Sequence, residues 1–165
     1  MSTTVDIQHI FPTYIAPITQ WLVIIAGWIY VSWDNNQREH RKEIRSQVNE
    51  IKNLILETRD NSFQYYTSTA SDPNAALLEL QIKEKLDRIE RSIDMLNNQT
   101  NAFSNKTTLV KLKDSITGYS QFESVSRQPL PHRDRLHGEI SLNSINSILY
   151  LEECFNNKYG KKKTN

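Results

Sequence analysis

The run from Ile15 to Trp33, IAPITQWLVIIAGWIYVSW, constrains this chain more than any other feature. It is nineteen residues long and contains no charged side chain. At about 1.5 Å per residue, a helix of this length spans roughly 28 Å, close to the hydrocarbon core of a bilayer at about 30 Å. Apolar residues occur on every face of such a helix, whereas a surface helix of a globular protein has one apolar stripe. The run therefore predicts a single transmembrane helix.

The charges on either side of this run predict its orientation. Residues 1–14 contain no Lys or Arg, and no small-residue cleavage site follows the run, which favours an uncleaved signal-anchor. The positive-inside rule then places residues 1–14 outside and the C-terminal domain in the cytoplasm, at a plasma or inner membrane. The terminal KKTN resembles a dilysine retrieval signal, which indicates the endoplasmic reticulum if the source is eukaryotic. The residues expected at the membrane interface are Tyr14, Trp33, Arg38, Arg41, Lys42 and Arg45.

The rest of the chain predicts an all-α fold. Four Gly and five Pro in 165 residues are few, which favours long helices over a β fold. We expect a single N-terminal transmembrane helix followed by a cytoplasmic bundle of about four helices. The expected parts after the anchor are a juxtamembrane helix at 34–60, a linker at 61–74, the remainder of the bundle at 75–159 and a basic tail at 160–165.

Hydrophobic periodicity places the helices of this bundle. Within the juxtamembrane helix, Ile44, Val48, Ile51 and Ile55 share one face. A second helix over about 73–97 contains a heptad seam typical of a coiled coil, which is expected to pack within the chain. A third helix is expected over about 106–125 and a fourth from between 131 and 139 to about Tyr159. The wide apolar face of the fourth predicts the most buried helix, through Ile140, Leu142, Ile145, Ile148, Leu149, Leu151 and Phe155.

The junction between the anchor and the juxtamembrane helix has two interpretations. Asn36 followed by Glu39 resembles a capping box, which would start a new helix after a kink. Alternatively, the anchor continues through Asp34–Gln37 as one rod. The sequence favours neither.

The loop between the third and fourth helices is the one segment with candidate binding chemistry. Its basic residues suggest an anion or partner contact, because arginine can hold an anionic group through two hydrogen bonds. The plainer interpretation is a solvated loop between two helices. The residues concerned are Arg127, His132, Arg133, Arg135 and His137.

Other kinds of site have no support in the sequence. There is no Gly-rich phosphate loop, nucleophile elbow or metalloprotease motif, so we predict no catalytic, cofactor-binding or metal-binding residues, no cofactor and no enzymatic activity. A net charge of +1 predicts no binding of nucleic acid. Cys154 is the only cysteine, which excludes an intrachain disulfide.

These features together favour a membrane-anchored interaction or scaffold protein. Its expected partners are the lipid bilayer and either another protein or copies of itself. One alternative is a self-assembling membrane effector or small channel component, in which several anchors associate. A second alternative is a small membrane-bound enzyme that uses the Arg127–His137 loop.

Overall fold

The computed structural model describes residues 16–160, and within them the chain is all-helical, with no strand. Its helices are α2 (Ala16–Thr67), α3 (Ala75–Thr100), α4 (Thr107–Thr117) and α5 (Arg135–Tyr159). The chain divides into two compact units, Met1–Glu43 and Ile44–Asn165. We call the second one the bundle unit. Helix α2 contributes to both units without a break, so the continuous helix, rather than the capped restart at Asn36, is the one that forms.

The structure corrects the prediction of a transmembrane helix. No helix within residues 16–160 combines the length and the apolarity needed to cross a membrane. The physical reason is that an uncharged stretch is not necessarily an apolar one. Thr19, Gln20 and Ser32 carry polar groups, and the Trp and Tyr side chains are amphipathic. Beyond Trp33, α2 continues directly into charged sequence.

The predicted single-pass localisation, with the N-terminus outside, is therefore wrong. The membrane-interface roles predicted for six residues were based on that transmembrane helix. Tyr14 lies outside the described residues. Trp33 is exposed on α2. Two basic residues of this region form ion pairs within α2: Arg38 pairs with Asp34 at 2.9 Å and Lys42 with Glu39 at 2.8 Å, whereas Arg41 is exposed.

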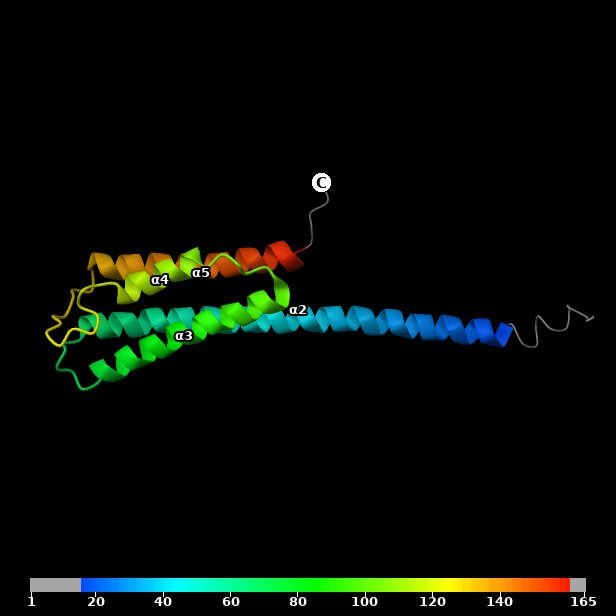
Figure 1. Ribbon diagram of the computed structural model, residues 1–165, viewed down its shortest axis with the longest axis horizontal. Coiled ribbons are helices and arrows are strands. Elements are labelled where there is room, and N and C mark those ends of the chain that lie inside the picture. Colours follow the sequence, from blue (N-terminus) through cyan, green and yellow to red (C-terminus); the bar gives the residue numbers. More distant parts are fainter. Residues whose placement is uncertain (1–15, 161–165) are drawn as a thin grey trace, which may run out of the picture. The chain divides into compact units, whose positions relative to one another are not determined.

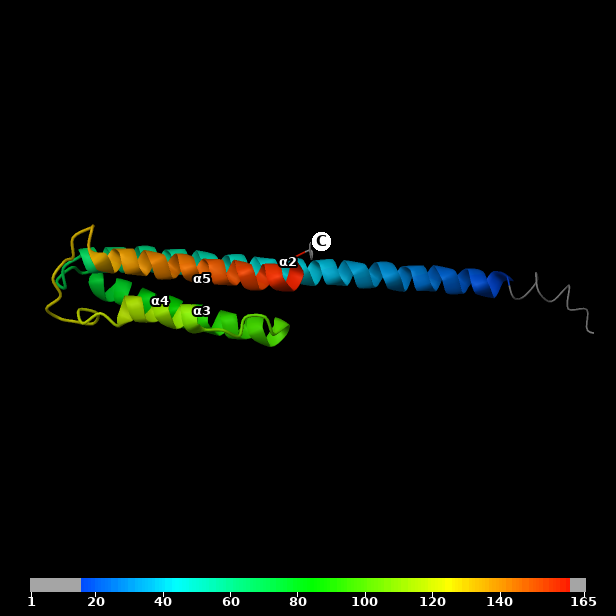
Figure 2. The ribbon, with the colours of Figure 1, turned by 90° about the horizontal axis from the view of Figure 1, so that it is seen from above.

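Four antiparallel helical segments make up the bundle unit. The part of α2 from Ile44 onward is followed by α3, α4 and α5, each running opposite to the one before it (Figure 1). Two perpendicular views show that consecutive helices are neighbours and that α5 returns alongside α2 (Figure 2). This is the up-and-down arrangement that short connections favour.

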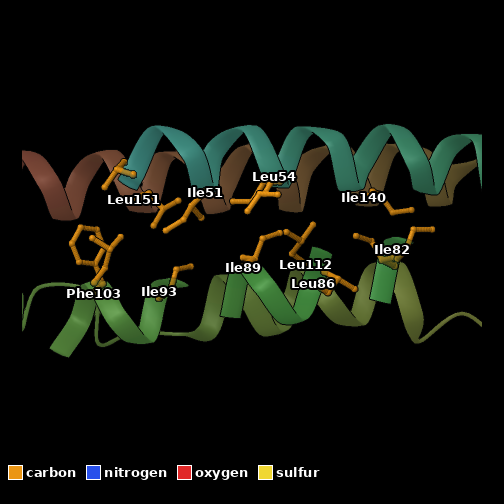
Figure 3. Packing of buried hydrophobic residues seen from close by; sticks show 14 of the residues in the cluster. Ile51, Leu54, Ile82, Leu86, Ile89, Ile93, Phe103, Leu112, Ile140 and Leu151 are labelled. Carbon is orange, nitrogen blue, oxygen red and sulfur yellow. The ribbon is translucent and has the colours of Figure 1, made fainter. Parts of the chain in front are cut away.

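The core lies between two layers, one formed by α2 and α5 and the other by α3 and α4 (Figure 3). The predicted faces of the first two helices supply nine of its 19 buried residues. Ile44, Val48, Ile51 and Ile55 of α2 are at most 1% exposed. The seam of α3 is buried in the same core through Ile82, Leu86, Ile89, Ile93 and Leu96. Intrachain packing of both faces is confirmed.

Two helix ends differ from the sequence-based prediction. Helix α2 continues through Thr67, so the first half of the predicted linker at 61–74 is helical. Tyr65 and Tyr66 lie there and are fully buried, which makes them part of the core. Helix α4 ends at Thr117, well before the predicted end, and the segment that follows includes Glu123 with a positive φ of 61°.

Small side chains let α4 and α5 approach each other closely. Ser144 and Ser147 of α5 are fully buried. The Ser147 hydroxyl lies 3.2 Å from the Thr108 carbonyl oxygen of α4 and 2.8 Å from the Asn143 carbonyl oxygen of its own helix. The Ser144 hydroxyl donates to the Ile140 carbonyl at 2.8 Å. Both hydroxyls therefore find partners although they face the interior.

Ser144→Leu is expected to destabilise the bundle unit by about 1–3 kcal/mol, because the close packing around Ser144 has no space for three more carbon atoms. Ser144→Ala is the matched control. It removes only a hydrogen bond to a carbonyl that α5 already uses, so we expect a change within about 1 kcal/mol. Urea unfolding followed by circular dichroism measures both. Equal stability of the two variants would show that this contact is not closely packed.

Candidate functional site

Arg127 is the most deeply placed of the five predicted contact residues, and the fold uses it internally. It is 4% exposed. Its guanidinium donates to the Ser68 carbonyl at 3.4 Å, the Ser68 hydroxyl at 3.2 Å and the Thr69 carbonyl at 3.2 Å. It also lies 3.7 Å from the centre of the Tyr65 ring, in cation–π contact. Arg127 thus supplies hydrogen-bond donors just past the C-terminal end of α2, where backbone carbonyl groups lack partners within the helix.

His137 is also buried, in the first turns of α5. It is 7% exposed, and neither ring nitrogen has a hydrogen-bond partner among residues 16–160. The Phe63 ring meets it edge-on at 4.8 Å. Burial lowers the pKa of His137 below its usual value. The Asp134 carboxylate opposes this shift, whereas His132 adds to it. The imidazole is therefore held neutral as an apolar packing group.

Replacing His137 with Phe is expected to reduce the acid sensitivity of the bundle unit. Because its folded pKa is lowered, the unfolded state binds the proton more readily, and stability falls as the pH drops below about 6.5. Above that value the neutral ring causes no loss. We expect the difference in unfolding free energy between the wild type and His137→Phe to be constant above about pH 7. From there towards pH 5, the wild type should lose stability relative to the variant. A constant difference across that range would contradict a buried neutral histidine.

The other three predicted residues lie on the surface. His132 and Arg133 are exposed in the loop before α5, and Arg135 is exposed in its first turn, where it pairs with Glu139 at 2.7 Å. Asp134 caps α5 by accepting from the Leu136 backbone N–H at 2.8 Å. The structure thus brings Arg127 and His137 into the fold and leaves His132 and Arg133 open. An anion contact at these two stays a prediction.

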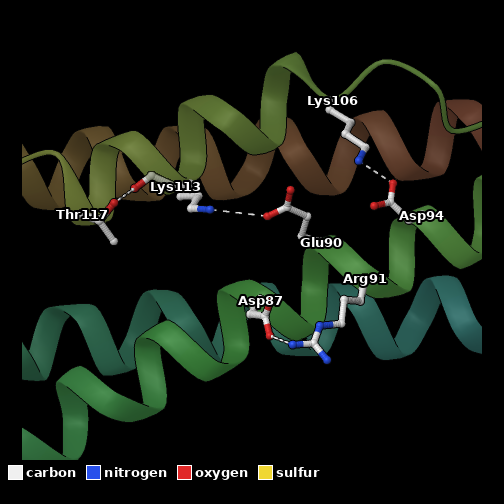
Figure 4. Close-up of polar contacts among 7 residues, drawn as sticks. All are labelled: Asp87, Glu90, Arg91, Asp94, Lys106, Lys113 and Thr117. Atoms are coloured by element: carbon white, nitrogen blue, oxygen red, sulfur yellow. Dashed lines mark hydrogen bonds and ion pairs between the residues drawn. The ribbon is translucent and has the colours of Figure 1, made fainter.

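A small cleft lies between α3 and α4 of the bundle unit. Its volume is about 90 Å³, and Leu86, Ile89, Leu109 and Leu112 contribute to its lining. Ion pairs cross from α4 to α3 beside it, Lys106–Asp94 at 2.5 Å and Lys113–Glu90 at 3.4 Å (Figure 4). Small-molecule sites usually measure about 300–1,000 Å³, so this cleft is a packing gap between helices. Residues 16–160 also contain no cluster of His, Cys, Asp or Glu suited to a metal ion.

The outward face of α5 is one feature of the bundle unit that its own packing does not explain. Leu142, Ile145 and Leu149 are 58%, 49% and 59% exposed. Their spacings of three and four residues place them along one face of the helix. We call these three residues the α5 ridge. The prediction that this helix buries its wide apolar face is wrong for them, because α5 turns its buried serines inward and three large aliphatic side chains outward.

The helix that carries the α5 ridge is fastened to α2 by an ion-pair cluster. Glu152 accepts from Arg45 at 2.6 Å and from Lys52 at 2.5 Å. These two cations hold the pKa of the Glu152 carboxyl below its usual value. The Arg45 guanidinium also lies 5.0 Å from the centre of the Phe155 ring. The contacts orient α5, so the ridge is presented on a rigid element.

Comparison with protein families, characterised proteins and solved structures finds no match to this chain. The α5 ridge was missed at the sequence level because seven apolar residues of α5 were assigned to one wide buried face. One signal was available. Ser144 and Ser147 alternate with the ridge residues, and four apolar positions elsewhere on the helix already suffice to fill an interior face.

Proposed function

We propose that this chain is a helical interaction or scaffold protein, whose bundle unit presents the α5 ridge to a protein partner. The single observation that carries this proposal is the exposure of Leu142, Ile145 and Leu149 on a helix that ion pairs fasten to α2. Apolar side chains gathered on a rigid surface favour association, because each loses contact with water when a partner covers it. The proposal is a binding role without catalysis.

The exposed residues of α2 support an interaction role independently. Ten large hydrophobic side chains in its first part are 49–72% exposed: Trp21, Leu22, Val23, Ile24, Ile25, Trp28, Ile29, Tyr30, Val31 and Trp33. Tryptophan and tyrosine are enriched among the residues that contribute most to protein–protein binding. We propose that this segment is a second interaction surface of the same scaffold.

Site-specific photocrosslinking of the full-length chain in living cells tests the role of the α5 ridge. A photoreactive phenylalanine analogue at Ile145 is expected to give discrete crosslinked species. The same analogue at Arg91, an exposed position on α3, is the matched control and should give only background. Leu142→Lys combined with Leu149→Lys should remove the species formed at Ile145 while leaving the circular dichroism spectrum unchanged, since both side chains are exposed. Equal labelling at the two positions would exclude the ridge as a binding surface.

A further inference from the structure

We infer that the partner of the α5 ridge is a second copy of this chain, whose α5 docks antiparallel across a two-fold axis near Ile145 and Asn146. This inference rests on the proposed function and identifies the occupant of the same surface. Figure 2 looks onto α5 and shows no other helix lying over it.

The spacing of the ridge is compatible with pairing to itself. Leu142 and Leu149 are seven residues apart and therefore lie on nearly the same face, with Ile145 between them. When two such helices meet antiparallel about their common centre, Leu142 of one copy lies opposite Leu149 of the other, and the reverse contact follows by symmetry. The two Ile145 side chains then meet near the axis. An isologous interface of this kind closes at two copies.

The charges at the two ends of the ridge select the antiparallel orientation. Arg135 and Glu153 are eighteen residues apart, about five helical turns, so both extend the face that carries the ridge. The Arg135 side chain is 91% exposed and pairs with Glu139 one turn along its own helix, whereas Glu153 is exposed and has no ion pair among residues 16–160. Antiparallel docking brings the basic end of each copy to the acidic end of the other. Parallel docking would place arginine beside arginine and glutamate beside glutamate, which is unfavourable.

Gly138 adds a steric argument. It lies seven residues before Ile145 on the same side of α5, and a β-carbon built on it would meet no atom within 4 Å. No contact within residues 16–160 therefore requires glycine there, although glycine weakens a helix relative to alanine. In the antiparallel pair, Gly138 lies opposite the segment around Glu153 of the second copy, and the missing side chain leaves room for the second helix.

The interface is short, with three apolar anchors from each copy. Such an interface lies at the small end of the range for specific complexes, so the dimer is expected to be reversible and to depend on concentration. For this reason the test uses a covalent trap rather than size alone.

Disulfide trapping in the full-length chain tests the inference. In a Cys154→Ser background, Asn146→Cys lies beside the axis and is expected to form a disulfide-linked dimer on mild oxidation. Arg135→Cys should not link to itself, but a mixture of Arg135→Cys and Asn156→Cys chains should link to each other. Arg91→Cys on α3 is the control for random collision and for any association through α2. Each yield is read on a non-reducing gel as a multiple of the Arg91→Cys yield.

Charge substitutions make a second, independent readout in the Asn146→Cys background. Glu153→Arg should lower the trapped yield several-fold, because position 153 lies opposite Gly138 of the second copy, about one helical turn from its Arg135. Adding Arg135→Glu to the same chain should restore the yield. Both changes are on the surface and should leave the fold intact.

Each outcome of the trapping experiment has a defined meaning. Trapping at 146 and in the 135/156 mixture, with rescue by the double charge reversal, supports the antiparallel dimer. Self-linking at 135 as well as at 146 would indicate a parallel pair and overturn the inference. Yields at the Arg91→Cys level throughout would exclude a second copy as the partner. The proposed function would then still be decided by the photocrosslinks at Ile145, which do not require the partner to be this chain.

Discussion

Tyr66→Ala is expected to lower the free energy of unfolding of the bundle unit by about 3–5 kcal/mol, the range for deleting a buried aromatic side chain. Tyr66 is fully buried at the end of the core, with its ring 5.2 Å from that of Tyr65 and 5.9 Å from that of Tyr119. Its backbone carbonyl also accepts from Leu130 at 2.7 Å, so one residue joins α2 to the loop before α5. Urea unfolding followed by circular dichroism measures the loss.

Tyr66→Phe separates packing from hydrogen bonding at the same position. The Tyr66 hydroxyl donates to the Ile116 carbonyl near the end of α4, and burial raises the pKa of this phenol well above its usual range. The phenylalanine variant keeps the ring but leaves that carbonyl without this donor, so we expect a smaller loss of about 1–3 kcal/mol. If Tyr66→Ala were tolerated as well as Tyr66→Phe, the aromatic cluster would not be part of the core.

Arg127→Met is expected to cost about 2–3 kcal/mol, the second largest effect. Methionine approximates the length of the side chain but removes three hydrogen bonds to residues 68 and 69 and the contact with the Tyr65 ring. The loss should depend only weakly on salt, because the hydrogen-bond acceptors are uncharged carbonyl and hydroxyl oxygens. Urea unfolding at low and high ionic strength measures both properties.

Arg133→Met is the matched control, since Arg133 is exposed in the same loop. We expect its stability to stay within about 0.5 kcal/mol of the wild type, as is usual for surface substitutions. Equal effects of the two substitutions would contradict an internal role for Arg127. In that case Arg127 would again be a candidate for the anion contact, together with His132 and Arg133.

Much of the bundle follows from the sequence because its signals are local. The face from Ile44 to Ile55 and the seam of α3 are read from spacing alone, and both lie in the core. A helix with one apolar stripe buries that stripe wherever the chain folds back, so the prediction does not depend on the partner helix. The start of α5 beyond the Pro-rich loop follows in the same way.

The candidate sites depended on information that spacing does not contain. Arg127 and Ser68 are far apart in the chain. No local sequence pattern shows that the Arg127 guanidinium binds to Ser68, the residue directly after α2. Five basic or imidazole side chains in one loop suggested a shared site, but two of them face inward and the others face solvent. Tertiary contacts decide whether a side chain of a loop faces the core or solvent, and an argument from composition does not include these contacts.

Helical class, the approximate positions of the helices and the core faces of α2 and α3 were therefore determined by the sequence alone. The uncharged run at 15–33 was recognised as the most apolar part of the chain, but its polar and amphipathic side chains made the transmembrane prediction wrong. Only the tertiary structure decided which apolar residues of α5 face inward. The reason is geometric: close contact with α4 needs small side chains, so Ser144 and Ser147 occupy the interface and Leu142, Ile145 and Leu149 are left facing out.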